Sequence, residues 1–149
     1  MKMELKYSAK PEGKTVKAIG RDMNVSFKDV VMISDAIRGM KVSKAIAFMN
    51  DVIALKRSVP YRRFRVGIGH RSGRQPKIGK YPKKAAGHVL AVLRNLEANA
   101  EFRGYDAERM KLVHVQALRG ISRVRRKPRG RWTMWKTEYC HIQMIAKET

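Results

Sequence analysis

Residues 82–104, with the sequence PKKAAGHVLAVLRNLEANAEFRG, contain the longest and most apolar helical pattern of this 149-residue chain. Apolar side chains recur at helical spacing from Ala85 to Ala100. Pro82 suits a first helical turn, and Gly104 stands just past the expected end. Burying such a stripe stabilises a fold by about 0.8 kcal/mol per methylene group. We therefore expect this helix to lie at the centre of the hydrophobic core.

Two shorter helical patterns precede it. The first covers residues 27–38, with Ser26 as a typical N-cap and Gly39 directly after the end. The second begins at Ser43, as its N-cap, and ends near residues 56–57, whose positive charges suit a helix C-terminus. The connection is only about four residues long, so we expect the two helices to pack as neighbours.

Alternation of apolar and polar residues predicts strands near both ends of the chain. Residues 15–25 show a weak strand pattern. Residues 111–117 alternate so that Val113 shares a face with Val115, and residues 139–146 alternate in the same way. We expect the two later strands to be half-buried. Helices and strands together indicate an α+β fold in a single domain over residues 1–149.

Positive charge concentrates in two windows that contain no acidic residue. Residues 60–84 carry nine Lys or Arg and residues 119–136 carry eight, which is half of the 34 in the chain. The other 106 residues have a net charge of only +5. Charge this dense repels itself unless an anionic partner neutralises it, and a phosphate backbone is the commonest such partner. The windows therefore favour nucleic-acid binding over the alternative of a solvated surface.

Each window has its own expected conformation. Residues 60–81 are rich in Gly and Pro without a clean period, and we call them the basic loop. Residues 119–137, between the two later strands, have a turn signal at residues 127–130 and predict a long β-hairpin, which we call the hairpin. Its tip would lie about 30 Å from the body at ~3.3 Å per residue. Such a ribbon is marginal alone, so we expect it to become ordered on binding.

Arginine outnumbers lysine in these windows, and aromatic residues lie among the arginines. Guanidinium groups bind phosphate bidentately and stack on bases, which suits folded or single-stranded RNA. No predicted helix carries these residues, so a major-groove DNA reader is disfavoured. Self-packing of the hairpin is the alternative for Trp132 and Trp135. The residues expected to bind RNA are Arg62, Arg63, Arg65, Arg71, Arg74, Lys77, Lys80, Lys83, Lys84, Arg119, Arg123, Arg125, Arg126, Arg131 and Trp132.

The sequence contains no spacing typical of a metal or catalytic site. The histidines are spread over different predicted elements, and we expect them to be structural or to lie near phosphates. His114 and His141 could lie opposite each other on paired strands. The single cysteine, Cys140, fits a small core position. We expect no metal, no cofactor and no catalysis, although a basic RNA-processing or RNA-modifying enzyme and an architectural DNA-binding protein remain alternatives.

Membrane insertion and export are also disfavoured. No apolar run approaches the ~18 residues of a transmembrane helix, and the first ten residues lack the apolar stretch of a signal peptide. We therefore expect an intracellular protein.

Three segments resemble a known family when their order and spacing are taken together. They are residues 37–40, residues 94–100 at the end of the long helix, and the basic hairpin that finishes at residues 140–142. This combination resembles the large-subunit ribosomal protein of the twenty-two family, in its archaeal and eukaryotic branch. The resemblance extends from about Val16 to Ile145.

The resemblance implies three helices packed on a small antiparallel three-stranded sheet, with a long basic β-hairpin extension. It also implies a cytoplasmic protein of the large ribosomal subunit that binds ribosomal RNA, acts in subunit assembly and contacts neighbouring ribosomal proteins. The hairpin would line the nascent-peptide exit tunnel, with a nascent peptide as a further partner. No membrane contact and no homo-oligomer are expected. The residues at the tunnel wall would be Lys127, Pro128, Arg129, Gly130 and Arg131.

Overall fold

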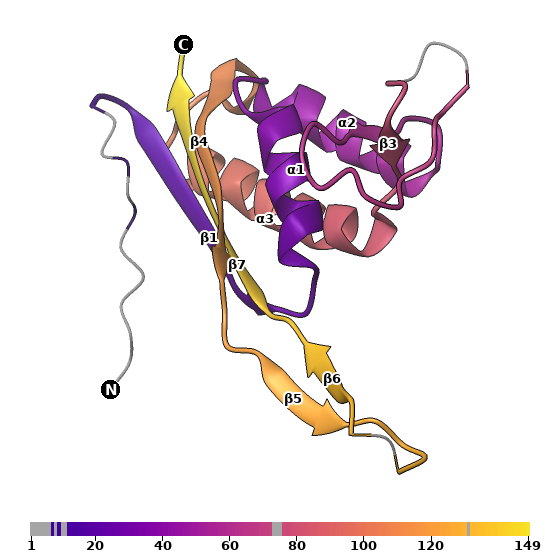
Figure 1. The fold of residues 1–149 in the computed structure, drawn as a ribbon. Helices are drawn as coiled ribbons and strands as arrows, with labels where there is room; N and C mark the ends of the chain where they lie inside the picture. The colour runs from indigo at the N-terminus through magenta and orange to yellow at the C-terminus, as the bar shows by residue number, and fades with distance from the viewer. Residues whose placement is uncertain (1–6, 8, 10–11, 73–75, 131) are drawn as a thin grey trace, which may run out of the picture.

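The computed structural model describes residues 7, 9, 12–72, 76–130 and 132–149. Within them, three helices and a three-stranded sheet form an α+β body, and a two-stranded ribbon extends away from it (Figure 1), as expected. In chain order the elements are β1 (Thr15–Met23), α1 (Phe27–Ile37), α2 (Val42–Ile53), β2 (Val59–Pro60), β3 (Gly79–Lys80), α3 (Lys83–Phe102), the 3-10 helix η1 (Ala107–Arg109), β4 (Met110–Arg119), β5 (Arg123–Arg126), β6 (Met134–Thr137) and β7 (Cys140–Glu148).

The main sheet has the order β1–β7–β4, and both of its pairings are antiparallel. The chain's last strand is therefore the central one. Gln143 and Ile145 are as fully buried as Met144, although they lie on the opposite face of β7. The half-buried interpretation of this strand is wrong, because every residue of a central strand has side-chain neighbours on both sides.

Strand β4 contains an irregularity that the strict alternation did not predict. The pairing with β7 shifts register between Leu112 and His114, which is the pattern of a β-bulge. Val113 is 45% exposed, whereas Leu112 and Val115 are buried. The expected shared face of Val113 and Val115 is therefore wrong, because the extra residue turns Val113 outward.

The two strand histidines, which could have been opposite each other, are not. His114 lies opposite Ile145, and His141 lies opposite Leu118. The Nδ1 atom of His141 instead accepts a hydrogen bond of 3.0 Å from the backbone N–H of Asp22. His141 therefore ties β7 to the end of β1.

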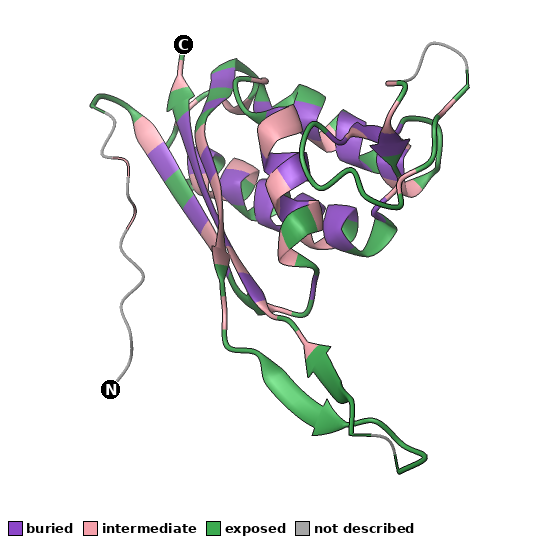
Figure 2. Ribbon diagram, viewed as in Figure 1, coloured by how far each residue is buried: buried purple, intermediate pink, exposed green. Residues whose placement is uncertain are grey.

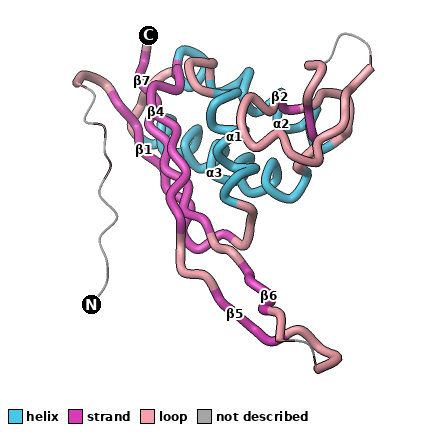
Figure 3. Tube along the Cα trace, in the orientation of Figure 1, coloured by secondary structure: helices cyan, strands magenta, loops and turns pink. Residues whose placement is uncertain are grey.

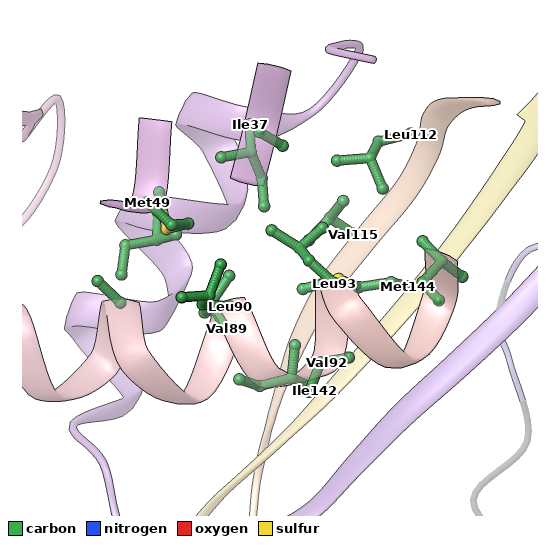
Figure 4. Close-up of a cluster of buried hydrophobic side chains, with 14 of the residues drawn as sticks. Ile37, Met49, Val89, Leu90, Val92, Leu93, Leu112, Val115, Ile142 and Met144 are labelled. Atoms are coloured by element: carbon green, nitrogen blue, oxygen red, sulfur yellow. The ribbon is translucent and has the colours of Figure 1, made fainter. Parts of the chain in front are cut away.

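Helix α3 occupies the centre of the core, as the sequence predicted. It packs against α2, β1 and β7. Figure 4 shows Leu93 of α3 among side chains from the other helices and the sheet, including Ile37, Met49, Val115 and Met144. Cys140 is also buried at the edge of this core, and burial raises the pKa of its thiol to about 11.

The helix boundaries differ from expectation at two places. Ser26 is the N-cap of α1, but its side chain makes no capping hydrogen bond. The N-cap of α2 is Lys41 rather than Ser43, which lies inside the first turn. The same helix ends at Ile53 instead of residues 56–57, because Leu55 takes a left-handed φ of 62° that ends the helical path.

The basic loop is closed at its base by a small ladder. Strands β2 and β3 pair antiparallel, with Val59 opposite Lys80 and Pro60 opposite Gly79. The Tyr61 N–H also donates to the Ile78 carbonyl at 3.1 Å. Figure 3 shows the loop in pink beside the helices, with these short strands at its base. The absence of a clean period hid this ladder, because two residues are too few to show one.

The hairpin continues the β4–β7 pairing beyond the body. Arg119 pairs with Cys140 in the main sheet, and Arg123 pairs with Thr137 in the ribbon. The segment leading into β5 therefore carries one more residue than the segment after β6, and the ladder is interrupted there. Strands β5 and β6 are almost wholly exposed (Figure 2). The predicted turn at residues 127–130 lies in the loop that joins them.

Two glycines offer a matched test of the packing. A Cβ on Gly20 would collide with Met23 and lie 2.8 Å from Cγ2 of Val92 on α3, whereas a Cβ on Gly87 would meet nothing within 4 Å. We expect Gly20→Ala to lower the free energy of unfolding by about 1–3 kcal/mol. We expect Gly87→Ala to raise it by about 1 kcal/mol, because alanine is the better helix former. Urea denaturation measures both, and a loss of stability in Gly87→Ala would contradict this account of α3.

The body should fold without the hairpin. None of the described residues of the exposed ribbon belongs to the buried core. The Gly120 N–H donates to the Tyr139 carbonyl at 2.8 Å where the main sheet ends. We expect a variant with residues 121–138 replaced by Asn-Gly, which favours a two-residue hairpin turn, to keep a cooperative thermal transition. Circular dichroism would measure it, and an unfolded variant would show that the ribbon stabilises the body.

Candidate nucleic-acid interface

A hollow lies where the hairpin leaves the body, and we call it the junction hollow. Its walls come from three separate segments: residues 24–26 with Asp29 at the start of α1, residues 82–85 at the start of α3, and residues 135–138 on the hairpin. The fold thus brings the end of the first basic window beside the second one. Lys83 and Lys84, both expected to bind RNA, belong to this site.

A second hollow adjoins the first, and we call it the loop hollow. Ser26 and Asp29 line both hollows. The remaining wall of the loop hollow comes largely from the basic loop, including Gly67 and Gly69. The start of α1 is therefore the place where the basic loop and the hairpin base meet on one surface.

Asp29 links the basic loop to α1. Its carboxylate accepts a hydrogen bond of 2.7 Å from the Tyr61 hydroxyl and lies 3.2 Å from Nζ of Lys80. Burial, together with this hydrogen bond to Asp29, raises the pKa of the Tyr61 phenol well above its usual range. The sequence did not predict this role. An acidic residue in the first turn of a helix, such as Asp29, is common, and its partners Tyr61 and Lys80 are distant in the chain.

Several of the predicted binding arginines also shape the loop. Arg63 forms an ion pair of 3.0 Å with Asp35 of α1. Nε of Arg71 donates to the Gly79 carbonyl at 2.8 Å, and its guanidinium lies over the ring of Tyr81. The Arg63 contact ties the loop to α1 while its side chain stays 63% exposed, and the Arg71 contacts brace the loop internally.

Other predicted binding residues of the first window lie on the surface or outside the described part. Arg62, Arg65, Lys77, Lys83 and Lys84 are exposed. Nε of Arg65 donates to the Arg62 carbonyl at 2.9 Å, which turns that side chain back along the loop. Arg74 of this window and Arg131 of the hairpin lie outside the described residues.

The hairpin presents cations on both of its faces. The register pairs Arg125 with Trp135 on one face and Val124 with Lys136 on the other. Because directly paired residues share a face and successive residues alternate, Arg123 lies with Arg125 and Arg126 lies with Lys136. An RNA segment on either side of the ribbon would therefore meet positive charge.

Arginine–aromatic stacking recurs along the ribbon. The Arg119 guanidinium lies 4.9 Å from the Phe27 ring centroid, which joins the hairpin base to α1. Arg126 lies 4.7 Å from the ring of Trp132, yet Trp132 stays 79% exposed. Self-packing thus covers only part of this indole, and most of its surface remains open to a partner.

Trp135 is a site residue that the predicted binding set omitted. It is 61% exposed and lines the junction hollow together with Lys83, Lys84 and Lys136. The signal in the sequence was its position beside the other tryptophan in the second window. Lys83 and Lys84 are far from Trp135 in the chain, and only the fold brings them together with it.

The described part of the chain has neither a candidate metal site nor a helix suited to a membrane. Among the described residues, no group of three or more His, Cys, Asp or Glu is placed to hold a metal ion. None of the helices described combines the length and the apolar character that crossing a membrane requires. Lysine and aromatic side chains line both hollows, and arginine is the commonest residue of β5.

Comparison with known proteins agrees with this architecture. The family model of ribosomal protein L22p/L17e matches residues 18–147. A protein of Archaeoglobus fulgidus named large ribosomal subunit protein uL22 is 42% identical, over 95% of this chain and 94% of its own length. A protein of the same name from Methanocaldococcus jannaschii is 40% identical, over 99% of this chain and 96% of its own length. The chain therefore belongs to the ribosomal protein L22p/L17e family.

Proposed function

We propose that this protein is a structural constituent of the large ribosomal subunit and binds ribosomal RNA. The names of its relatives support its assignment to the large ribosomal subunit. The observation that carries RNA binding is the continuous surface at the start of α1, where two acid-free basic windows meet. We assign no catalytic role, because the relatives described above are named as subunit proteins.

Binding is electrostatic in its main part. Lysine and arginine side chains that contact phosphates release condensed counterions, and this release supplies much of the affinity. The body docks by shape, while the hairpin inserts between RNA segments that its two cationic faces contact. The exposed cations of residues 62–84 and of the hairpin are the proposed contacts, together with Trp132.

The hairpin tip has a different proposed role. Arg129 and Gly130 take left-handed φ values of 74° and 65°, which make a tight reversal at the tip. We propose that the tip, with Lys127 and Pro128, lies at the wall of the nascent-peptide exit tunnel. The family resemblance supports this position, and the exposure of residues 127–130 and 132–133 fits it. Residues of the tip would then contact peptides in transit.

The proposal includes the protein's setting in the cell. It acts in cytoplasmic ribosomes, assists assembly of the large subunit and contacts neighbouring ribosomal proteins through the body. It works as one copy in each subunit rather than as a homo-oligomer.

RNA binding by the free protein should depend steeply on salt. If roughly six to ten phosphates are contacted, the affinity for ribosomal RNA should fall by ~10³–10⁵ between 50 and 200 mM salt. Replacing Arg123, Arg125 and Arg126 by alanine should reduce the slope of log affinity against log salt by roughly 0.7–0.9 for each lost contact. Filter binding measures the slope. Lys44→Ala, outside both windows, is the matched control, and a flat salt response would refute the electrostatic mechanism.

Tip and stem should respond differently in translating ribosomes. A photoreactive residue at position 129 should crosslink to nascent chains, whereas one at position 125 should crosslink to ribosomal RNA. Arg129→Ala should leave subunit assembly nearly intact, because the tip carries few RNA contacts in this arrangement. Arg125→Ala should weaken assembly. Crosslinks from position 129 to RNA alone would count against the tunnel-wall position.

A further inference from the structure

The junction hollow places an exposed indole beside lysines from another part of the chain. From this arrangement we infer that the hollow holds one unpaired RNA nucleotide, with its base on Trp135 and its phosphates at Lys83 and Lys84. The inference deepens the proposed function and rests on it. It names a form of RNA that neither the charge windows nor the family membership specifies.

The charge of the hollow favours a phosphate. Lys83 and Lys84 are exposed at the start of α3 and line the hollow. Lys136 of the hairpin also lines it, but from the face of the ribbon opposite to that of Trp135. Two carboxylates also line the hollow, but both have cationic partners: Asp29 lies 3.2 Å from Lys80, and Glu138 lies 3.8 Å from Lys136. The remaining lysines therefore leave the hollow net positive.

Backbone groups add to this field. Helices α1 and α3 both begin at the hollow, and neither N-cap residue, Ser26 or Pro82, provides a capping side chain. The N–H groups of a first helical turn lack partners within the helix and bind anions well. They supplement the lysines and do not make the site by themselves.

The size and the aromatic wall select one nucleotide over a duplex. The hollow has a volume of 510 Å³, within the roughly 300–1,000 Å³ of sites that hold a single small molecule. A base can stack on an indole only after it has left its own helical stack. Strand β6 pairs with β5 alone among the described strands, so its other edge offers backbone groups to the base.

The two tryptophans allow a matched test in the full-length protein. Trp132→Phe leaves Trp135 as the only indole, inside the hollow, and Trp135→Phe leaves Trp132, outside it. The probes are a short RNA duplex with one unpaired adenosine and the same duplex with an abasic nucleotide in its place. Both probes carry the same phosphates, so they differ only in the base. Intrinsic fluorescence reports the environment of each indole, and a titration gives the affinity.

We expect the adenosine probe to bind about tenfold more tightly than the abasic probe, which corresponds to one base–aromatic stack. Trp135 fluorescence should be quenched by the adenosine probe and much less by the abasic one, while Trp132 should respond alike to both. Trp135→Ala should abolish the preference. The double variant Lys83→Ala/Lys84→Ala should weaken both probes equally, and circular dichroism should show that these exposed substitutions leave the fold intact.

Three results would overturn the inference. They are equal affinity for the two probes, a preference that survives Trp135→Ala, and quenching of Trp135 by an acidic peptide as strong as that by the adenosine probe. If salt-dependent binding to ribosomal RNA persists alongside any of these results, the proposed function stands and only the nucleotide site fails. If the full chain binds no RNA at all, the proposed function itself fails.

Discussion

The antiparallel pairing of β4 with β7 is the interaction on which the rest of this structure depends. It runs from Met110 opposite Glu148 to Arg119 opposite Cys140, and the hairpin continues the same ribbon. Along the body, helices pack on these two strands, and most side chains of β7 and three of β4 are buried. On the hairpin side of the Arg119–Cys140 pair, the strands β5 and β6 are exposed and carry many cationic side chains. Two successive strand pairings, separated by one interruption, therefore serve first as the core of a domain and then as an exposed basic arm.

Body acids hold part of the positive charge in place. Asp29 and Asp35 of α1 pair with Lys80 and Arg63 of the basic loop. Each pair is partly exposed, so its contribution to stability is small. Its geometric effect is larger, because it keeps a self-repelling segment against α1 and beside the hairpin base. The surface that results is preorganised in the body, which reduces the entropy lost when RNA binds.

The positions at which α1 and α3 begin determine where the proposed binding surface lies. The starts of α1 and α3 lie at one hollow with residues of β6. Packing in the core fixes the orientation of each helix. The orientation of α1 and α3 places their N-terminal ends near the hairpin. The proposed RNA-binding surface is thus a consequence of burying α3, although Ala85 is the one buried α3 side chain that lines either of its two hollows.

The local pattern of the sequence was enough to predict the three helices, the two basic windows and the hairpin. The apolar stripe of α3 repeats from Ala85 to Ala100, and charge without acids needs no fold to be recognised. Tertiary structure alone decided the central position of β7, the outward turn of Val113, the role of Asp29 and the meeting of Lys83 with Trp135. The physical reason is range: periodicity and charge are properties of neighbours in the chain, whereas burial on both faces of a strand and the walls of a hollow depend on residues that are far apart in it.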